Sequence, residues 1–278
     1  MPFGLRNAPQ VFQRAINSAL KPLDDDRILV YMDDVLSVSE TVSEGLVRLD
    51  KLLETLSNSG FSFNFDKCSF MKKKIEYLGY TISSGEIRPN HRKIEVSQKL
   101  PTPSTVTQVR QLIGLASDFR QFIPNFPKLL KPLYPLTAAG KGKISWTPDH
   151  NKVLKTIITH LTNKPVLKIF DPKLPIELHT DASSEGYGAV LIQKVNHLPH
   201  VIAYFSHRTT GAESRYHSYE LETLAVVKAV EHFRHYLYGR KFTVFTDCSS
   251  LKASHSKKDL MPRVHRWWAI FLCPMISI

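Results

Sequence analysis

Residues 28–39 read ILVYMDDVLSVS, and this stretch decides the fold of the first part of the chain. Two apolar runs flank Asp33 and Asp34, which predicts a tight hairpin with both carboxylates at its tip. Adjacent carboxylates repel each other and raise each other's pKa, so a divalent cation would relieve the cost of the pair. Phosphoryl transfer commonly uses two such ions about 4 Å apart. The alternative is a solvent-exposed turn, in which Asp-Asp is common.

Helical and extended patterns surround this hairpin. Phe12, Ile16 and Leu20 are spaced for one buried face of a helix. After the hairpin a second helix is predicted over residues 41–59, with Gly60 as its end. Its capping box and apolar stripe come from Thr41, Glu44, Leu46, Leu49, Leu53 and Leu56. Alternating phenylalanines predict a strand over residues 61–65, and another strand over 75–82 leads into a turn at 83–85.

Positive charge is concentrated in the middle of the chain. Residues 89–172 hold 13 lysines and arginines against 4 acidic residues, whereas residues 1–88 hold 11 against 12. A basic middle next to clustered acids suggests a polyanion bound across the centre, with metal held by the acids. A lysine-rich surface that only keeps the protein in solution is the plainer alternative.

Composition excludes several classes of protein. Hydrophobic residues make up 42% and charged residues 22%, which excludes a disordered tail, a collagen-like fibre and a disulfide scaffold. Three scattered cysteines, Cys68, Cys248 and Cys273, indicate reduced thiols in an intracellular protein, with cytoplasm and nucleus both open. The apolar tail 267–278 is too short to cross a bilayer, so no membrane partner is expected.

The second half of the chain changes from helical to mixed patterns. A linker at residues 101–104 precedes predicted helices over 106–122 and 149–161. Strands IELHTDAS, YGAVLIQ and HVIAYFSH then lead to a long helix over 216–238 and a strand FTVFTD. Acids lie at two strand ends, Asp181 and Asp247, and on the helix at Glu220 and Glu222. The order βββαβ predicts a mixed α/β (α+β) domain.

Several of these segments together resemble one family. MPFGLRNAPQVFQ, VYMDDVL and YLGYTISSGEIRPNHRK resemble the reverse transcriptase of gypsy-like LTR retrotransposons, which is related to retroviral Pol polyproteins. The resemblance continues through PTPSTVTQVRQLIGLASDFRQFIPNFPKLLKPLYPLT and RYHSYELETLAVVKAVEHFRHYLYGRKFTVFTDCSSLK, to about Trp268. It implies a partial polymerase palm with a β-hairpin YMDD site over 1–88 and a basic, helical thumb and connection region over 89–172. An RNase H-like domain, C-terminally incomplete, is implied over 173–278.

The resemblance also implies roles for residues of the palm. Asp33 and Asp34 correspond to its catalytic, metal-binding aspartates. The residues implied to contact nucleotide, template or primer are Phe3 and Gly4 in the nucleotide pocket, Tyr31 and Met32 beside the primer end, and the primer grip Leu78, Gly79 and Tyr80. The implied partners are an RNA–DNA hybrid, a DNA or RNA template-primer, dNTP and other parts of a Pol polyprotein.

In the second half, Asp181, Glu222 and Asp247 can converge only through the fold. Acids at neighbouring strand ends facing a helix carboxylate could hold two Mg²⁺ ions for hydrolysis of a phosphodiester. The pattern resembles ribonuclease H, which cuts the RNA strand of an RNA–DNA hybrid with two Mg²⁺ or Mn²⁺ ions. Glu222 is the favoured helix acid and Glu220 the alternative.

The chain departs from the family pattern at both ends. The resemblance implies a third palm aspartate upstream of Met1 and a fourth RNase H aspartate beyond Trp268, where this chain reads AIFLCPMISI. We therefore expect a half-built polymerase site, no primer extension by this chain alone, and impaired RNase H cleavage. Three hypotheses follow: a Pol fragment with both chemistries in its lineage, a non-catalytic nucleic-acid-binding remnant, and a translated relic without a selected role.

Overall fold

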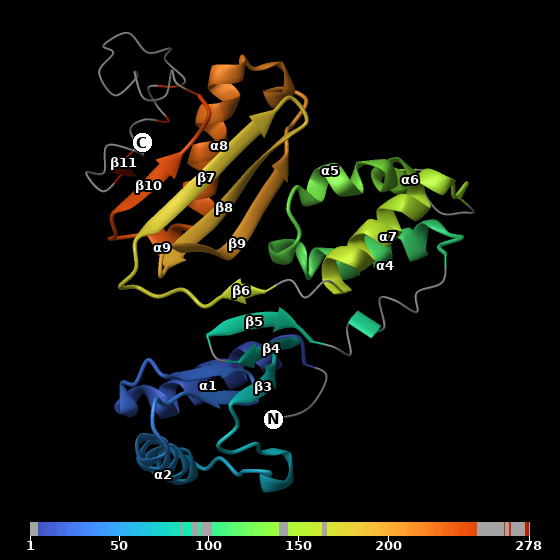
Figure 1. The fold of residues 1–278 in the computed structure, drawn as a ribbon. Coiled ribbons are helices and arrows are strands. Elements are labelled where there is room, and N and C mark those ends of the chain that lie inside the picture. Colours follow the sequence, from blue (N-terminus) through green and yellow to red (C-terminus); the bar gives the residue numbers. More distant parts are fainter. Residues whose placement is uncertain are drawn as a thin grey trace. The chain divides into compact units, whose positions relative to one another are not determined.

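The computed structural model describes residues 5–83, 85–90, 94–95, 102–138, 144–162 and 166–248, and residues 264, 267, 276 and 277. Phe3 and Gly4 lie outside these described residues, as does most of the tail 268–278. The chain divides into two compact units, residues 1–78 with 82–84 and residues 79–81 with 85–278 (Figure 1). The predicted division into three regions stays a prediction.

The first unit is built around the predicted hairpin. Its elements are α1 (Ala8–Leu20), η1 (Lys21–Leu23), β1 (Ile28–Tyr31), β2 (Asp34–Ser37), α2 (Val42–Asn58), η2 (Phe65–Lys67) and β3 (Lys74–Tyr77). β1 and β2 pair antiparallel, from Ile28 opposite Ser37 to Tyr31 opposite Asp34. Ile16 of α1 is buried against Leu52 and Leu56 of α2, and Phe12 and Leu20 pack around them. The predicted hairpin and the predicted face of α1 are therefore confirmed.

Three details of the first unit differ from the sequence-based expectation. Leu52 and Leu56 are the buried leucines of α2, whereas Leu46 is 53% exposed, because the face towards α1 lies on a different side of the helix. The Phe61–Phe65 strand is wrong: Phe61 and Phe63 pack into the core, but Phe65 is exposed and begins η2. The capping box of α2 is half formed, because Thr41 caps the Glu44 amide while the Glu44 carboxylate accepts from the Glu40 amide.

The predicted strand over residues 75–82 is interrupted. β3 ends at Tyr77, and β4 (Tyr80–Ser83) begins after a turn at Leu78 and Gly79. Both turn residues have positive φ angles, 50° and 82°. A left-handed backbone cannot continue a ladder, so two short strands replace one long strand.

The basic middle of the chain is helical, as predicted. Its elements are β5 (Glu86–Pro89), α4 (Val106–Ser117), η3 (Arg120–Phe122), α5 (Phe126–Leu130), η4 (Lys131–Leu133), α6 (Tyr134–Ala138), α7 (Pro148–Thr162) and β6 (Leu167–Lys168). A capping box starts α4: Thr105 Oγ1 accepts from the Gln108 amide, and Gln108 Oε1 accepts from the Thr105 amide. Phe119, Ile123, Leu130 and Leu133 are fully buried among these helices.

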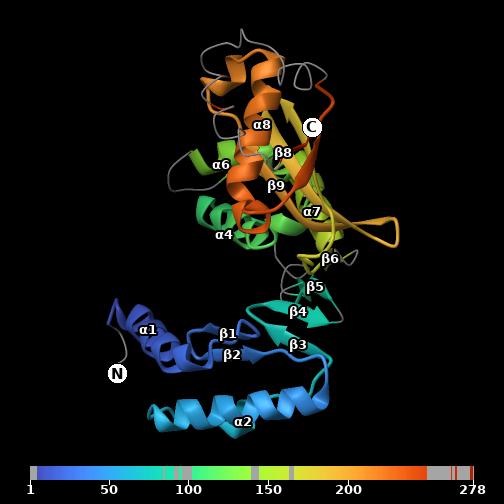
Figure 2. The same cartoon turned by 90° about the vertical axis from the view of Figure 1, so that its left-hand side faces the viewer.

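The last part of the chain is a sheet with a helix on one face (Figure 1, Figure 2). Its elements are β7 (Ile176–Ser183), β8 (Gly186–Val195), β9 (Leu198–Arg208), η5 (Glu213–Arg215), α8 (Ser218–His232), α9 (Arg234–Leu237), β10 (Phe242–Phe245) and β11 (Ile276–Ser277). The strand order is β11-β10-β7-β8-β9, with β10 parallel to β7 and β8 antiparallel to its two neighbours. The mixed α/β (α+β) fold and the βββαβ order are confirmed.

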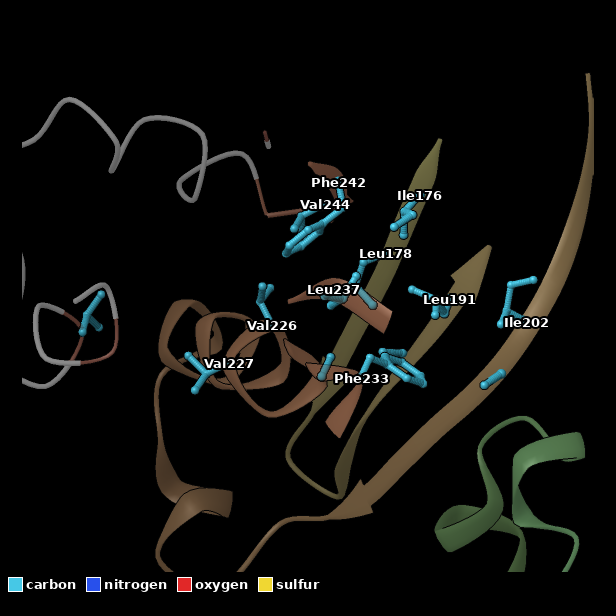
Figure 3. Close-up of a cluster of buried hydrophobic side chains, with 14 residues drawn as sticks. Ile176, Leu178, Leu191, Ile202, Val226, Val227, Phe233, Leu237, Phe242 and Val244 are labelled. Carbon is cyan, nitrogen blue, oxygen red and sulfur yellow. The ribbon is translucent and has the colours of Figure 1, made fainter. Parts of the chain in front are cut away.

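The core of this sheet explains its alternating sequence. Ile176, Leu178 and Leu191 point from the strands towards Val226 and Phe233 of the helical layer (Figure 3). The predicted single helix over 216–238 divides at Phe233, which begins α9 as its N-cap. Phe233 is 1% exposed and packs into the core at this break. Among the described residues, no helix is both long and apolar enough to span a bilayer.

Two leucines of this sheet provide a matched test of the core. Leu178 is 0% exposed and Leu198 is 63% exposed. We expect Leu178→Ala to lower the free energy of unfolding by about 2–5 kcal/mol, because it leaves a cavity. Leu198→Ala should change it by about 0.5 kcal/mol or less. Urea denaturation followed by circular dichroism measures both; equal midpoints for the two variants would contradict this packing.

Candidate metal centre and palm hairpin

Three acids from distant parts of the sequence meet at one end of the sheet. Asp181 lies on β7, Glu222 on α8, and Asp247 two residues after the end of β10. Each offers a carboxylate oxygen, and these oxygens lie within 4.8 Å of one another. Within the described part of the chain, these three acids form a group that could hold a metal ion.

The strand register explains how the two aspartates meet. β10 pairs parallel with β7, and Phe245 lies opposite His179. Continuing this register by two residues places Asp247 beside Asp181. Asp181 is inside β7, which runs on to Ser183, so the expectation that the strand ends at Asp181 is corrected by two residues.

Glu222 is the buried member of the group, at 5% exposure. Its Oε1 accepts a hydrogen bond from the Ala182 amide at 3.2 Å, whereas its Oε2 has no hydrogen-bond partner. Burial, with the negative charges of Asp247 and Asp181, raises the pKa of Glu222 to about 7. A buried carboxylate oxygen without a donor is costly, and oxygen ligands are the kind that hard divalent cations take. The three residues therefore fit a divalent cation.

Glu220, the alternative helix acid, has a different place. Its Oε2 accepts from the His217 amide at 3.2 Å, which closes a capping box at the start of α8. The His217 ring accepts from the Tyr219 amide. These contacts fix the start of the helix that carries Glu222 towards the aspartates.

The hairpin of the first unit holds its two acids in a strained turn. Met32 and Asp33 form the turn between β1 and β2, and Met32 has a φ of 54°. Glycine usually takes the first central position of such turns, so a methionine there needs support. Asp33 and Asp34 are both exposed. Within the described residues, no third acid joins them in a group of three.

Gln13 of α1 supplies that support, and no sequence pattern pointed to it. Its Oε1 accepts from the Met32 amide at 2.6 Å, and its Nε2 donates to the Val30 carbonyl at 3.3 Å. The side-chain amide thus bonds to the backbone on both sides of Tyr31 and fixes the turn that carries Asp33.

The base of the hairpin is closed by Arg48 of α2. Its Nε bonds to Asp25 before β1 at 2.6 Å, and its Nη1 donates to the Val38 carbonyl after β2 at 2.7 Å. Its Nη2 reaches Glu44 at 2.9 Å. Arg27 also pairs with Glu44. Both strands are therefore tied to α2 at the base of the hairpin.

The remaining predicted palm residues are spread over neighbouring elements. Tyr31 is 53% exposed at the end of β1, and Leu78 is 41% exposed in the turn after β3. Tyr80 packs against Phe122, with ring centroids 5.9 Å apart, and its hydroxyl donates to the Asp118 carbonyl. Burial and the charge of Asp34 raise the pKa of Tyr77.

Two family matches cover the hairpin acids and two of the three acids of the candidate metal centre, Asp181 and Glu222, and the second match ends three residues before Asp247. Residues 1–82 match the reverse transcriptase (RNA-dependent DNA polymerase) family, and residues 146–244 match the RNase H-like domain found in reverse transcriptase. The retrovirus-related Pol polyprotein from transposon 297 of Drosophila melanogaster is 34% identical over 271 residues, 96% of this chain. The chain therefore carries a reverse transcriptase family region and an RNase H-like region, and the relatives that it matches are Pol polyproteins of retrotransposons.

Other relatives agree with this assignment. The Pol polyprotein from transposon gypsy of the same fly is 32% identical over 96% of this chain. The chain spans about a quarter of these two relatives, 25% and 27% of their lengths. The resemblance to gypsy-like retrotransposon Pol proteins is therefore confirmed.

Solved structures of foamy viral protease-reverse transcriptase share the fold. The match to the complex with double-stranded DNA has a TM-score of 0.84 at 26% identity, and it covers 99% of this chain and 49% of the viral chain. The match to the complex with an RNA/DNA hybrid has a TM-score of 0.81 at 26% identity, and it covers 100% of this chain and 38% of the viral chain.

The pKa of Glu222 in this RNase H-like region predicts a pH dependence of stability. The folded state holds this proton more tightly than the unfolded state, whose pKa is near 4.5. Stability should therefore fall as pH rises from 4.5 to about 7 and level off above it. In metal-free buffer, the stability of Glu222→Gln relative to wild type should rise by on the order of 3 kcal/mol between acid and alkaline pH. Urea titrations measure stability at each pH, and profiles of Glu222→Gln and wild type that run parallel would contradict this prediction. Glu220→Gln is the control and should follow the wild-type profile.

Proposed function

We propose that Asp181, Glu222 and Asp247 form the site of an RNase H that cuts the RNA strand of RNA–DNA hybrids with two Mg²⁺ or Mn²⁺ ions. The observation that supports this most is the unpartnered, buried Oε2 of Glu222 beside two exposed aspartates. Burying a carboxylate without a donor costs free energy, and a group of acids that is merely exposed on a surface does not carry this cost. The buried position of Glu222 therefore supports a role for its free oxygen as a cation ligand.

Each acid has a distinct task in this proposal. Asp181 is held by the ladder on a central strand, so its position is set by the backbone of the sheet. The Ala182 amide fixes one oxygen of Glu222 and leaves the other to bind a cation. Bound divalent ions would supply the positive charge that orients the phosphate and activates the attacking water. Asp247, exposed two residues after the end of β10, completes the set.

We also propose that the first unit is part of a reverse transcriptase palm acting on a template-primer and dNTP. Asp33 and Asp34 would bind the metal ions of nucleotidyl transfer. Tyr31 and Met32 would line the primer end, with Phe3 and Gly4 in the nucleotide pocket. Leu78, Gly79 and Tyr80 would grip the primer. Support comes from the family match over residues 1–82 and from the turn that Gln13 holds.

The basic middle of the chain supports nucleic acid as the partner. Residues 89–172 carry 13 lysines and arginines against 4 acids, which suits phosphate contacts. In this proposal residues 1–88 are palm, 89–172 thumb and connection, and 173–278 RNase H. The second candidate function, a non-catalytic binder of the same duplexes, rests on this charge alone.

The RNase H proposal is tested by cleavage of a labelled RNA–DNA hybrid in Mg²⁺. Asp181→Asn should reduce the rate at least about 100-fold, since removing a direct ligand should exceed the loss from an outer contact. Glu220→Gln keeps the capping box and should retain the wild-type rate. Cleavage that persists in Asp181→Asn refutes the assignment, and wild-type binding without cleavage favours the non-catalytic binder.

The palm proposal is tested by Mn²⁺ binding in the Asp181→Asn background, which weakens the other site. Asp33→Asn or Asp34→Asn should each lower the remaining Mn²⁺ affinity about tenfold or more, because each removes a charged ligand. Asp24→Asn is the control, because Asp24 lies in a nearby turn with a φ of 42° that asparagine also accepts. Equal affinities in all three variants would rule out a metal site at the hairpin.

A further inference from the structure

An ion pair joins the helical middle of the chain to the hairpin turn next to the acid cluster. Ser184 and Glu185 form the turn between β7 and β8. Lys131, at the start of η4, places its Nζ 2.5 Å from Glu185 Oε1. Both side chains are about half exposed, 54% and 48%, so the pair is open to solvent and to a ligand.

Two further cations act on the same carboxylate. Hydrogen bonding to Lys131, with the charges of Lys131, Lys128 and Arg208, holds the pKa of Glu185 below its ordinary value. Lys128 lies on α5, and Arg208 ends β9 with its guanidinium 5.9 Å from the centre of the Tyr134 ring. Helix α5 contacts β9, which places Lys128 and Arg208 on neighbouring elements. Lys131 thus pairs with the Glu185 carboxylate, and the charges of two further exposed cations, Lys128 and Arg208, act on it.

The turn does not depend on the Glu185 carboxylate. The Glu185 amide donates to Ser183 Oγ, and Ser183 Oγ donates to the Gly186 carbonyl. Thr209 closes the turn from β9: its Oγ1 donates to the Ser184 carbonyl at 2.7 Å, and its amide donates to the Glu185 carbonyl. The backbone and neighbouring hydroxyls therefore fix the turn, and the carboxylate contributes only charge.

This cluster lies close to the candidate metal centre. Asp181 pairs with Gly188, and Ser183 pairs with Gly186 at the end of the same ladder. Two residues along a strand span about 7 Å, or about two base steps of a duplex. Asn125, at the start of α5, lies against β8 at the same level: a methyl group added to Gly188 would lie 3.5 Å from its Oδ1.

We propose that Lys128, Lys131 and Arg208 bind a backbone phosphate of the RNA–DNA hybrid beside the scissile position, and that Glu185 occupies this site until the phosphate displaces it. The proposal rests on the proposed RNase H function and names a contact that this function uses. Glu185 acts as an internal competitor, because its carboxylate takes the lysine that the phosphate needs.

The energetics permit this exchange. An ion pair between exposed side chains contributes little stability, so breaking it costs little. A duplex phosphate brings a permanent charge and releases condensed counterions when it is bound. Removal of the competitor should therefore tighten hybrid binding, whereas a purely structural ion pair would give the opposite sign or no change.

The test is the affinity of the full chain for a fluorescein-labelled RNA–DNA duplex, measured by anisotropy in Ca²⁺ so that the duplex stays intact. Glu185→Gln should tighten binding about two- to fivefold, the range that an exposed pair allows. Lys131→Gln should weaken binding and reduce the slope of log affinity against log salt by about one.

Matched controls come from an exposed pair outside the basic middle, Lys228 with Glu231 on α8, whose Nζ–Oε2 distance is 2.8 Å. Glu231→Gln and Lys228→Gln change the net charge by the same amounts and should leave affinity and slope unchanged. Equal tightening by Glu185→Gln and Glu231→Gln, or an unchanged slope in Lys131→Gln, overturns the inference. If the inference fails in this way, loss of cleavage in Asp181→Asn would still support the proposed RNase H function. A wild-type chain that binds no RNA–DNA hybrid would refute both the inference and the proposed function.

Discussion

The packing of α8 against the central strands is the constraint on which the candidate metal centre depends. Leu178 and Leu191 of the sheet meet Val226 and Ala229 of the helix in one buried cluster. That contact sets the depth of α8 and so carries Glu222 to the Ala182 amide. The charged end of Glu222 is buried because the rest of its helix has to be. The free-energy cost of burying the Glu222 carboxylate is thus offset by the burial of apolar side chains along the same helix. The packing of the core therefore keeps the acid in place.

The two acidic sites differ in how they are built. Asp33 and Asp34 are neighbours in sequence at the tip of one hairpin; Gln13 of α1 holds the turn, and Arg48 of α2 holds the base of the hairpin. Asp181, Glu222 and Asp247 come from two strands and a helix, and only the β7–β10 register brings the aspartates together. The first arrangement is local and exposed, and the second is non-local and partly buried. In the second arrangement, burial and the charges of the two aspartates raise the pKa of Glu222 to about 7.

The sequence predicts correctly those elements that are determined by neighbouring residues. The β1–β2 hairpin, the β7–β9 strands and the choice of Glu222 over Glu220 as the acid that joins the aspartates follow from periodicity and from the family resemblance. It failed where tertiary contacts decide. Phe65 alternates with Phe61 and Phe63, yet only the latter two find the core. The break at Leu78 needs positive φ at a residue whose type gives no warning. Gln13 is an ordinary polar residue of a helix until the hairpin folds onto it, so no pattern could have named it.

The parallel pairing of β10 with β7 has a consequence for the order in which the protein folds. Parallel strands cannot be joined by a tight turn, and here the connection from β7 to β10 passes through β8, β9 and α8. Contacts of such long sequence separation form slowly, because the chain between them must be ordered first. Asp247 therefore joins Asp181 and Glu222 only once the intervening layers are in place. A nascent chain would hold no complete acid cluster, and any cation that needs all three would bind the finished fold alone and stabilise it by mass action.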